Sequence, residues 1–271
     1  MQAVGRPEPL SDSAVVRLWP SRRPLAGTYH HRAVELVSGW HRHELHEIEY
    51  AVSGVAEMRT EEAHYLLPPQ HAAWIPAGVP HCPVLRDVET IAVFFDPMAF
   101  AFEHDRPLIL PVPSVLREMI RYATRWPIGR EVPGDEADAT AFFGALAVVV
   151  RGQLAQDAPL SLPVSDDPVI AAVMEHTTAH LGEVTAASVC RAVGISTRTL
   201  RRRFPAVVGQ TWRDYVHQAR LVRAMALLSE PRRSVLQVAR TVGFESPAAF
   251  ARAFRAWTGE APSSYRQHFR R

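Results

Sequence analysis

Apolar residues in the last hundred positions recur every three or four residues, which is the spacing of one face of an α-helix. Phe250, Phe254 and Trp257 show this most clearly, with alanine and arginine on the other faces. The pattern, with Ser or Thr at N-cap positions, predicts helices over residues 169–181, 186–192, 197–208, 212–229, 235–242 and 247–258 and a last turn near 262–269. We therefore expect this part of the chain to be entirely helical.

The first hundred positions show short apolar runs separated by proline and glycine. Such runs predict strands at residues 48–52, 64–67, 72–75 and 91–95. We expect all-β structure from residue 33 to 95, with a leading strand or two within 1–32 and a crossing punctuated by proline over 96–110. Several short strands of this kind are typical of a small β-barrel.

Between these two regions, the apolar pattern predicts helices over residues 114–126 and 136–155, joined by a loop at 127–134. The second helix is apolar around much of its circumference, which favours burial. Residues 157–167 are proline-rich, contain few core-forming residues and are expected to form a hinge. The fold class is thus α+β, with a β-barrel first and an all-α domain last.

The helical region contains an internal repeat. Val189 and Gly194 recur 49 positions later as Val238 and Gly243, and the positions after the turn recur at an offset of 50. The recurring pairs after the turn are Leu200 with Phe250, Arg202 with Arg252, Phe204 with Phe254, Gly209 with Gly259 and Tyr215 with Tyr265. Each copy has two short helices joined at a glycine turn, with arginine on the second, which describes a helix-turn-helix.

Net charge is unevenly distributed along the chain. Residues 166–271 contain 16 arginines and 8 acidic residues, a net charge of +8, whereas residues 1–165 have a net charge of −6. A basic end joined to an acidic one fits a nucleic-acid-binding module attached to a sensor. The chain has no lysine, so every permanently charged basic side chain is an arginine, whose guanidinium can form two hydrogen bonds to a phosphate or a guanine. Cys82 and Cys190 fall in different predicted domains, which is consistent with a reducing cytoplasm.

The sequence from about residue 168 to 271 resembles the DNA-binding domain of AraC/XylS-family transcription regulators. The resemblance rests on V-A-x-x-x-G-F-x-S-x-x-x-F-x-R-x-F at 238–254 and G-x-x-P-x-x-Y-R at 259–266. It implies sequence-specific binding of double-stranded DNA over two adjacent major-groove turns in the bacterial cytoplasm. It also implies a homodimer, which the two middle helices often form in this family, and contact with RNA polymerase if the chain is an activator.

The residues expected at the DNA are Ser196, Thr197, Arg198, Arg201 and Arg202 from the first copy and Ser246, Ala248, Ala251 and Arg252 from the second. Arginine discriminates guanine, whereas alanine can only touch a thymine methyl group, so we expect the first copy to set most of the sequence preference. The second copy is expected to position the protein through Arg252 and the helix start at Ser246. Arg203 and Arg255 are expected at a solvated or phosphate-facing edge. Pro205 is expected to end or kink its helix early.

Two motifs in the β region, H-x-H-x3-E-x6-G from His41 and P-x-G-x-x-H ending at His81, resemble the two cupin motifs. Histidines two apart on a strand project to the same face. The resemblance implies a cupin-type barrel that binds a single divalent metal ion, Zn, Ni, Fe, Mn or Cu, through His41, His43, Glu47 and His81. Two positions depart from the motifs, because Glu35 and Leu85 replace the expected glycine and asparagine.

If no metal is bound, the same residues would line a pocket or face solvent, and the pocket would hold a small-molecule effector. Its expected aromatic walls are Trp40, Tyr50, Trp74, Phe94 and Phe95, of which at least half are expected to be ordinary core. His46 is expected to face outward from its strand, and Cys82 to fill a small buried space.

We therefore expect a cupin-like sensor domain over residues 1–110, a helical dimerisation or linker region over 111–165 and an AraC-type DNA-binding domain over 166–271. No apolar run reads as a signal peptide or a membrane span. A transcription regulator without enzymatic activity is the favoured function. The alternative is a metal-dependent cupin enzyme, such as a dioxygenase or isomerase, with an appended DNA-binding domain. No second carboxylate or nucleophile pattern near the predicted metal supports turnover.

Overall fold

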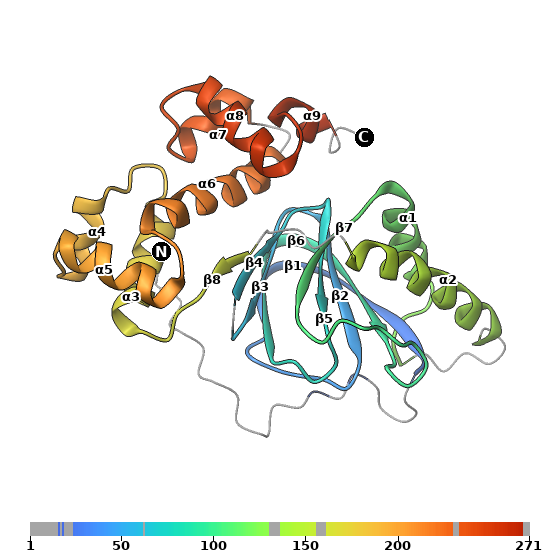
Figure 1. The fold of residues 1–271 in the computed structure, drawn as a ribbon. Coiled ribbons are helices and arrows are strands. Elements are labelled where there is room, and N and C mark those ends of the chain that lie inside the picture. The colour runs from blue at the N-terminus through green and yellow to red at the C-terminus, as the bar shows by residue number, and fades with distance from the viewer. Residues whose placement is uncertain are drawn as a thin grey trace. The chain divides into compact units, whose positions relative to one another are not determined.

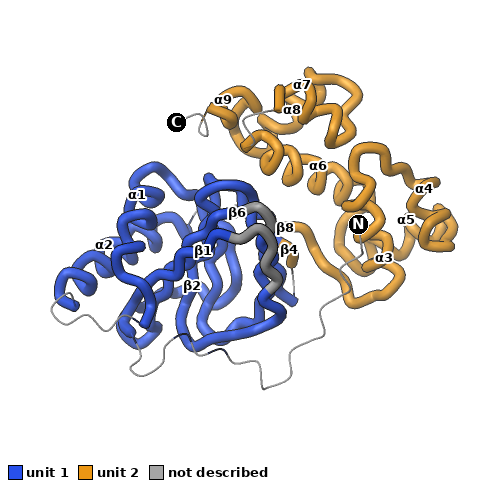
Figure 2. Tube along the Cα trace, turned by 180° about the vertical axis from the view of Figure 1, so that it is seen from behind, with its two compact units in different colours: residues 1–61, 65–160 blue, residues 62–64, 161–271 orange. Residues whose placement is uncertain are grey.

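The computed structural model describes residues 16, 18, 24–61, 63–129, 136–155, 161–229 and 233–267, apart from the side chains of 33–37 and 86–87 (Figure 1). The chain divides into two compact units (Figure 2). The first comprises Met1–Glu61 and Tyr65–Leu160, and the second Glu62–His64 and Ser161–Arg271. The leading segment, the loop at 127–134 and the hinge at 157–167 lie partly outside the described residues, as does the side chain of Glu35.

The first unit is built on an antiparallel sheet in the order β7-β5-β2-β6-β3-β4, with β1 also paired to β6. Its strands are β1 (Ala26–Val37), β2 (His46–Ser53), β3 (Ala56–Thr60), β4 (Ala63–Leu67), β5 (His71–Ile75), β6 (His81–Phe95) and β7 (Leu108–Pro111). One edge of β6 pairs with β1 along its length, and the other pairs with β3 at its start and β2 at its end. The four predicted runs all lie in strands, and β7 occupies the end of the proline-punctuated crossing.

The two faces of the sheet have different roles, because side chains alternate along a strand. Ile48 and Tyr50 of β2 belong to a hydrophobic core shared with two helices, whereas Glu47 and Glu49 point to the other face. The remaining large members of this core are Trp74, Val93, Phe95, Leu116, Ile120, Phe143, Leu146 and Val150.

Helices α1 (Ser114–Ala123) and α2 (Glu136–Leu154) cover one face of the sheet (Figure 1). Both lie within the predicted ranges. By length and composition alone, α2 could cross a bilayer, but Phe143, Leu146 and Val150 on its buried face pack into the core of the β-domain. Burial of α2 was expected from its apolar circumference, and this core accounts for it.

From Ser161 onward, the described part of the second unit is helical apart from the short strand β8. Its elements are β8 (Ser161–Pro163), α3 (Pro168–Ala179), α4 (Ala186–Val193), α5 (Thr197–Val208), α6 (Trp212–Ser229), α7 (Val235–Thr241), α8 (Pro247–Thr258) and α9 (Pro262–Gln267). The α+β class and the two helix-turn-helix units are confirmed, and α5, α6 and α8 have the predicted bounds. The expectation that Pro205 ends α5 early is wrong, whereas a kink at this residue stays a prediction. The helix continues to Val208, and Gly209 closes it by donating its N–H to the Pro205 carbonyl.

The repeat in sequence is also a repeat in packing. Phe204 and Phe254 are fully buried, and each ring contacts a tyrosine from the following helix. The ring centroids are 5.5 Å apart for Phe204 with Tyr215 and 5.3 Å apart for Phe254 with Tyr265. Equivalent positions therefore build equivalent small cores in the two helix-turn-helix units.

Replacing Ser234 with alanine is expected to destabilise the helical unit by about 1 kcal/mol. Ser234 and Gln237 form a capping box at the start of α7, in which each side chain satisfies a backbone N–H of the other residue, at 3.1 and 2.7 Å. Thermal unfolding followed by circular dichroism measures the loss. Ser264→Ala, at an exposed site on α9, is the control and should change stability by less than about 0.5 kcal/mol.

Candidate effector and DNA-binding sites

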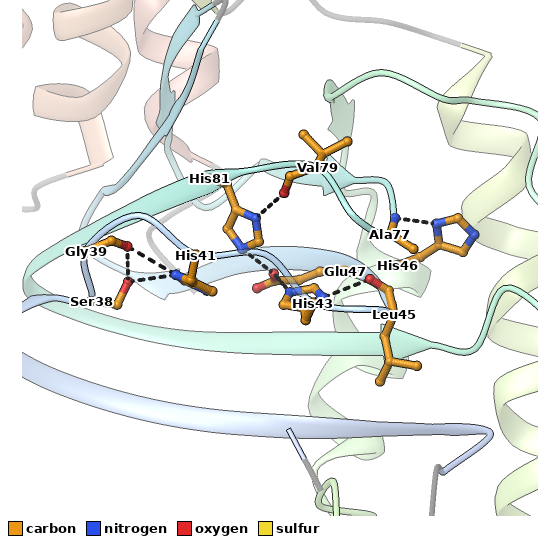
Figure 3. A network of polar contacts seen from close by, with 10 residues as sticks. All are labelled: Ser38, Gly39, His41, His43, Leu45, His46, Glu47, Ala77, Val79 and His81. Atoms are coloured by element: carbon orange, nitrogen blue, oxygen red, sulfur yellow. Dashed lines mark hydrogen bonds and ion pairs between the residues drawn. The ribbon is translucent and has the colours of Figure 1, made fainter. Parts of the chain in front are cut away.

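The four cupin-motif residues converge in the β-domain, although they come from three segments (Figure 3). His41 and His43 precede β2, Glu47 is the second residue of β2, and His81 opens β6. The expectation that the first two histidines lie on a regular strand is wrong. His41 instead forms an isolated bridge with His81, with both backbone N–H···O distances 2.9 Å. This bridge brings the two motifs together.

Each of the three histidines has its Nδ1 held by a backbone carbonyl two residues away. The distances are 3.1, 2.9 and 2.9 Å for His41, His43 and His81, to the carbonyl oxygens of Gly39, Leu45 and Val79. A carbonyl oxygen only accepts, so Nδ1 carries the proton and the neutral ring keeps its lone pair on Nε2. This is the tautomer that ligates a metal ion through Nε2.

The Glu47 carboxylate lies against two of these rings. Its Oε2 is 2.9 Å from Nε2 of His43 and 3.2 Å from Nε2 of His81. The His81 nitrogen is buried, so Glu47 rather than solvent faces it. In the neutral tautomer, two ring lone pairs would face a carboxylate oxygen. The arrangement therefore needs a cation, either a ring proton or a metal ion.

Burial and mutual charge shift the pKa values of this cluster. Burial would raise the pKa of Glu47, but hydrogen bonds from His43 and His81 outweigh it and hold this pKa well below its ordinary value. Burial would lower the pKa of His81, but the hydrogen bond and charge of Glu47 more than reverse this and raise it. In His41, burial and then the charge of His81 lower the pKa. In the metal-free chain, the added proton is therefore best held between His81 and Glu47.

The residues of the cluster fit a divalent metal ion. The ligand atoms of His41, His43 and His81 lie within 4.8 Å of one another. Glu47 is not part of that trio, but its carboxylate adjoins two of the rings. Three imidazoles and one carboxylate suit Zn, Ni, Fe, Mn or Cu and do not choose among them.

The His81–Glu47 pair is expected to stabilise the metal-free chain less at pH 8.5 than at pH 6, and zinc should remove that dependence. The raised pKa of His81 means that its protonated ring contributes fully below the ordinary value of 6.5, and the contribution is lost as pH rises through the folded pKa. The depressed pKa of Glu47 means that its contribution is present above 4.5 and is lost only on acidification. His41, His46 and His71 act in the opposite direction, because their pKa values are lowered. Thermal unfolding of the wild type and of His81→Ala at both pH values, with chelator or zinc, therefore isolates the effect. An equal drop with and without zinc would contradict it.

A second carboxylate, that of Glu49, lies beside Glu47. The two residues share one face of β2, and Glu49 is 5% exposed with its Oε1 buried and without a hydrogen-bond partner among the described residues. Burial raises the pKa of Glu49 well above its usual value, and the charge of Glu47 adds to the shift. The expectation of no second carboxylate near the cluster is therefore wrong. The i, i+2 spacing in H-E-I-E could have revealed it.

Replacing Glu49 with glutamine is expected to stabilise the metal-free chain at pH 8 by about 1–3 kcal/mol, because it removes a buried group that must either ionise or take up a proton. A raised folded pKa lowers stability as pH rises above the ordinary value of 4.5, so the gain should shrink toward pH 4.5. Urea unfolding at both pH values is the measurement. Glu61→Gln, at an exposed position, is the control. A gain independent of pH would show that Glu49 does not carry this cost.

The aromatic residues expected to line an effector pocket do not share one face of the sheet. Tyr50, Trp74 and Phe95 belong to the helix-covered core, because they are out of phase with Glu47 along or across the sheet. Phe94 lies on the side of the cluster, with its ring centroid 5.4 Å from that of His43. Trp40 is half-buried. Of the expected pocket residues, Phe94 is thus the one that contacts a histidine of the cluster.

His46 faces the opposite way to Glu47 and is buried, so the expectation that it faces outward is wrong. It lies on the same face as Ile48, which is the face that the helices cover. Its ring stacks on Trp74 at 4.9 Å, and its Nδ1 accepts the N–H of Ala77 at 3.1 Å. Burial lowers the pKa of His46. Cys82 is fully buried, as expected.

The predicted DNA-contacting residues lie mostly on exposed surface at the starts and outer faces of α5 and α8. Exposed members are Ser196, Thr197, Arg198, Arg201, Arg202, Ser246, Ala248 and Arg252, and Ala251 is half-buried. Ser196 accepts the N–H of Thr199 at 3.0 Å, and Ser246 accepts that of Ala249 at 3.4 Å. Arg255 is exposed, but Arg203 is not at a free edge. It pairs with Asp167, the N-cap of α3, at 2.7 Å (Nη2) and 2.9 Å (Nε).

Comparison with known proteins agrees with the two domains that carry these residues. A family model described as an AraC-like ligand-binding domain matches residues 28–91, and one described as a helix-turn-helix domain matches residues 189–268. The HTH-type transcriptional regulator NimR of Escherichia coli K12 is 29% identical over 236 residues, which is 85% of this chain and 83% of that protein. The chain belongs to the AraC family of transcription regulators.

Other AraC-family likenesses cover the DNA-binding end. The HTH-type transcriptional regulator VqsM of Pseudomonas aeruginosa is 40% identical over 72 residues, 27% of this chain and 22% of that protein. The solved DNA-binding domain of AdpA in complex with a target DNA is 30% identical, with a TM-score of 0.35, and the match covers 37% of this chain and 92% of that one.

As an AraC-family member, the chain is a DNA-binding transcription regulator with an N-terminal ligand-binding domain, and its DNA partner is double-stranded. The N-terminal match contains the three histidines and both buried glutamates, and the C-terminal match contains both helix-turn-helix units from residue 189 of α4 onward. The curated relatives are transcription regulators rather than enzymes.

Proposed function

We propose that this AraC-family regulator reads two successive major-groove turns with α5 and α8, and that a divalent metal ion or small effector at the His41–His43–Glu47–His81 cluster controls that reading. The observation that carries the first part is the repeat of packing, in which two equivalent helix-turn-helix units flank one long helix. The proposed domains are a sensor over 1–110, a linker over 111–165 and a DNA reader over 166–271.

The geometry of the helical unit supports reading of two adjacent turns. Helix α6 has 18 residues and spans about 27 Å at 1.5 Å per residue, which is close to the roughly 34 Å between successive major-groove turns. The exposed surface of α5 carries three guanidinium groups, those of Arg198, Arg201 and Arg202, whereas the exposed surface of α8 carries Arg252 among alanines. We infer that α5 supplies most of the base discrimination and that α8, with the Ser246 helix start, positions the unit on phosphate.

At the cluster, Nε2 of each histidine and the Glu47 carboxylate would hold the metal ion. A bound ion supplies a fixed positive charge that replaces the proton between His81 and Glu47. His41 and His43 precede β2, and His81 opens β6. Ligation by all three would tie two segments that are otherwise joined by the backbone bridge of His41 and His81.

We further propose a homodimer in the bacterial cytoplasm, with contact to RNA polymerase if the output is activation. The outer face of α2 supports pairing of subunits, because Val148 is 61% exposed and Cβ atoms added at Gly144 and Gly152 would meet no atom within 4 Å. Small side chains let two helices approach closely. A monomer mass measured by light scattering at micromolar concentration would rule out the proposed homodimer.

The second candidate function is a metal-dependent cupin enzyme with an appended DNA-binding domain, and Glu49 is the observation that favours it. A buried carboxyl beside the cluster is the kind of group that acts as a general acid or base. Oxygen uptake by the metal-loaded chain with a panel of small organic acids, abolished by chelation, would favour this enzyme. We propose that the chain regulates transcription without catalysing a reaction, because an enzymatic function would leave the two helix-turn-helix units unexplained.

The proposed DNA reading is tested with the full chain and a pool of random-sequence duplexes in mobility-shift assays. Affinity should fall at least about tenfold between 50 and 200 mM salt, since neutralised phosphates release counterions. The triple variant Arg198→Ala, Arg201→Ala, Arg202→Ala should bind more weakly and with a shallower salt dependence. If the folded chain shows no salt-sensitive affinity for any duplex, the proposed reading is wrong.

A further inference from the structure

Two turns of the helical unit touch each other through glycine backbones. Gly182 follows α3, and Gly243 follows α7. A Cβ atom built on Gly182 would lie 2.7 Å from the carbonyl oxygen of Thr241, and one built on Gly243 would lie 2.5 Å from the carbonyl oxygen of Gly182. Ordinary van der Waals contact begins at 3.4 Å. Neither position therefore has room for a side chain while the turns stay in contact.

Arg220 of α6 reaches into the same place. Its Nε donates to the carbonyl of Leu181 at 3.3 Å, and its Nη2 lies 2.7 Å from the position of a Gly243 Cβ. Burial lowers the pKa of Arg220, and the nearby charge of Glu245 opposes that shift. A single guanidinium thus contacts the turn after α3 and the turn after α7. We call Gly182, Arg220 and Gly243 the glycine–arginine junction.

The first helix-turn-helix unit has no such contact at the matching position. Gly194 occupies the same place in the repeat as Gly243, and both have left-handed backbones, with φ of 74° and 85°. A Cβ atom on Gly194 would meet nothing within 4 Å. The helix-turn-helix motif itself therefore needs glycine for its backbone angle alone. The close approach at Gly243 is an addition, and it joins one unit to the other.

This addition changes how freely the two units can move. Helices α3, α4 and α5 contact one another, α7 contacts α8, and α6 links the two groups. With α6 as the sole link, bending or twisting of that helix would alter the relation between α5 and α8. The glycine–arginine junction makes a second connection, which restrains the relation between the two recognition helices.

We propose that the glycine–arginine junction sets the number of base pairs between the two half-sites that this chain accepts. The proposal rests on the two-turn reading proposed above. Each added base pair moves a half-site by about 3.4 Å and turns it by about a tenth of a helical turn. A rigid pair of helices cannot follow that change, whereas a pair joined by α6 alone can.

The test selects binding sites for the full wild-type chain from random duplexes and then measures affinity for the selected duplex with one base pair inserted between its half-sites. The affinity of the wild type should fall at least about tenfold, because the recognition helix at one half-site loses its base contacts. For Gly182→Ala and Gly243→Ala, the same insertion should lower the affinity less than about threefold. Both variants should also select a wider range of half-site spacings, with unchanged half-site sequences. Gly194→Ala carries the same left-handed backbone cost as Gly243→Ala without the contact, and it should behave as the wild type.

Circular dichroism and thermal unfolding confirm that each variant is folded. If either glycine variant of the junction fails to fold, Arg220→Met replaces it, because it removes the guanidinium and leaves both backbones unchanged. It should also reduce the insertion penalty. Folded junction variants that keep the full tenfold penalty and a single spacing overturn the proposal. A wild type that selects one undivided half-site overturns the two-turn reading instead.

Discussion

Replacing His81 with alanine is expected to lower the affinity of the chain for zinc at least about 100-fold. Mutating the outer partners of a metal ligand alone costs about 10–100-fold, so removing a ligand costs more. His81 is 1% exposed, its Nδ1 is fixed by the Val79 carbonyl, and its Nε2 points at Glu47. Competition with a chromophoric chelator, starting from a metal-stripped chain, measures the affinity.

The matched control is His46→Gln. His46 is also buried in the β-domain, but its ring stacks on Trp74 rather than facing the cluster. Zinc affinity should change less than about threefold in this variant, well short of the loss expected for a ligand or its outer partners. If the His81 variant still binds one tight zinc per chain, or if both variants lose zinc equally, the cluster is not the metal site. An organic effector would then be the remaining occupant of the domain.

Replacing Arg201 with alanine is expected to weaken binding to the preferred duplex by about 1–3 kcal/mol, roughly 5–150-fold, and to relax the preference at one base pair. Arg201 is exposed on α5, while the neighbouring Leu200 and Phe204 are buried and fix the orientation of the helix. The guanidinium is thus presented on a rigid surface, where a bidentate contact with guanine discriminates between bases. Binding-site selection with the wild type and the variant measures the change.

The control for this prediction is Arg252→Ala on α8. We expect it to weaken binding to all sequences by a similar factor and to leave the preferred sequence unchanged, because a phosphate contact carries no base information. An unchanged preferred sequence with Arg201→Ala would refute the role of α5. A changed preference with Arg252→Ala would show that α8 also reads bases.

The helical unit could be predicted closely because its signals are local. Ser196 and Ser246 cap α5 and α8, Gly209 and Gly259 end them, and apolar spacing gives the buried face between. The Arg203–Asp167 pair could not be predicted. It joins residues 36 positions apart, and nothing near either residue distinguishes a paired arginine from a solvated one.

The β-domain was harder because both faces of its sheet are buried. The usual alternation of polar and apolar residues is then lost, and His46 to Tyr50 are all buried. Which face of the sheet a residue lies on depends on the register of strand pairing. That register places Tyr50 on the face covered by the helices and Glu49 on the face of the cluster, and it cannot be read from the sequence alone. The cupin-like spacing still located the three histidines, although the expected strand at His41 and His43 is wrong.

The alanine-rich outer surface of α8 has a consequence for engineering. Ser246 starts this helix and Phe250 and Phe254 anchor it, so neither its start nor its packing depends on the exposed Ala248. A library randomised at Ala248 should therefore yield folded regulators with new operator preferences, and the same position offers natural populations a route to new target promoters.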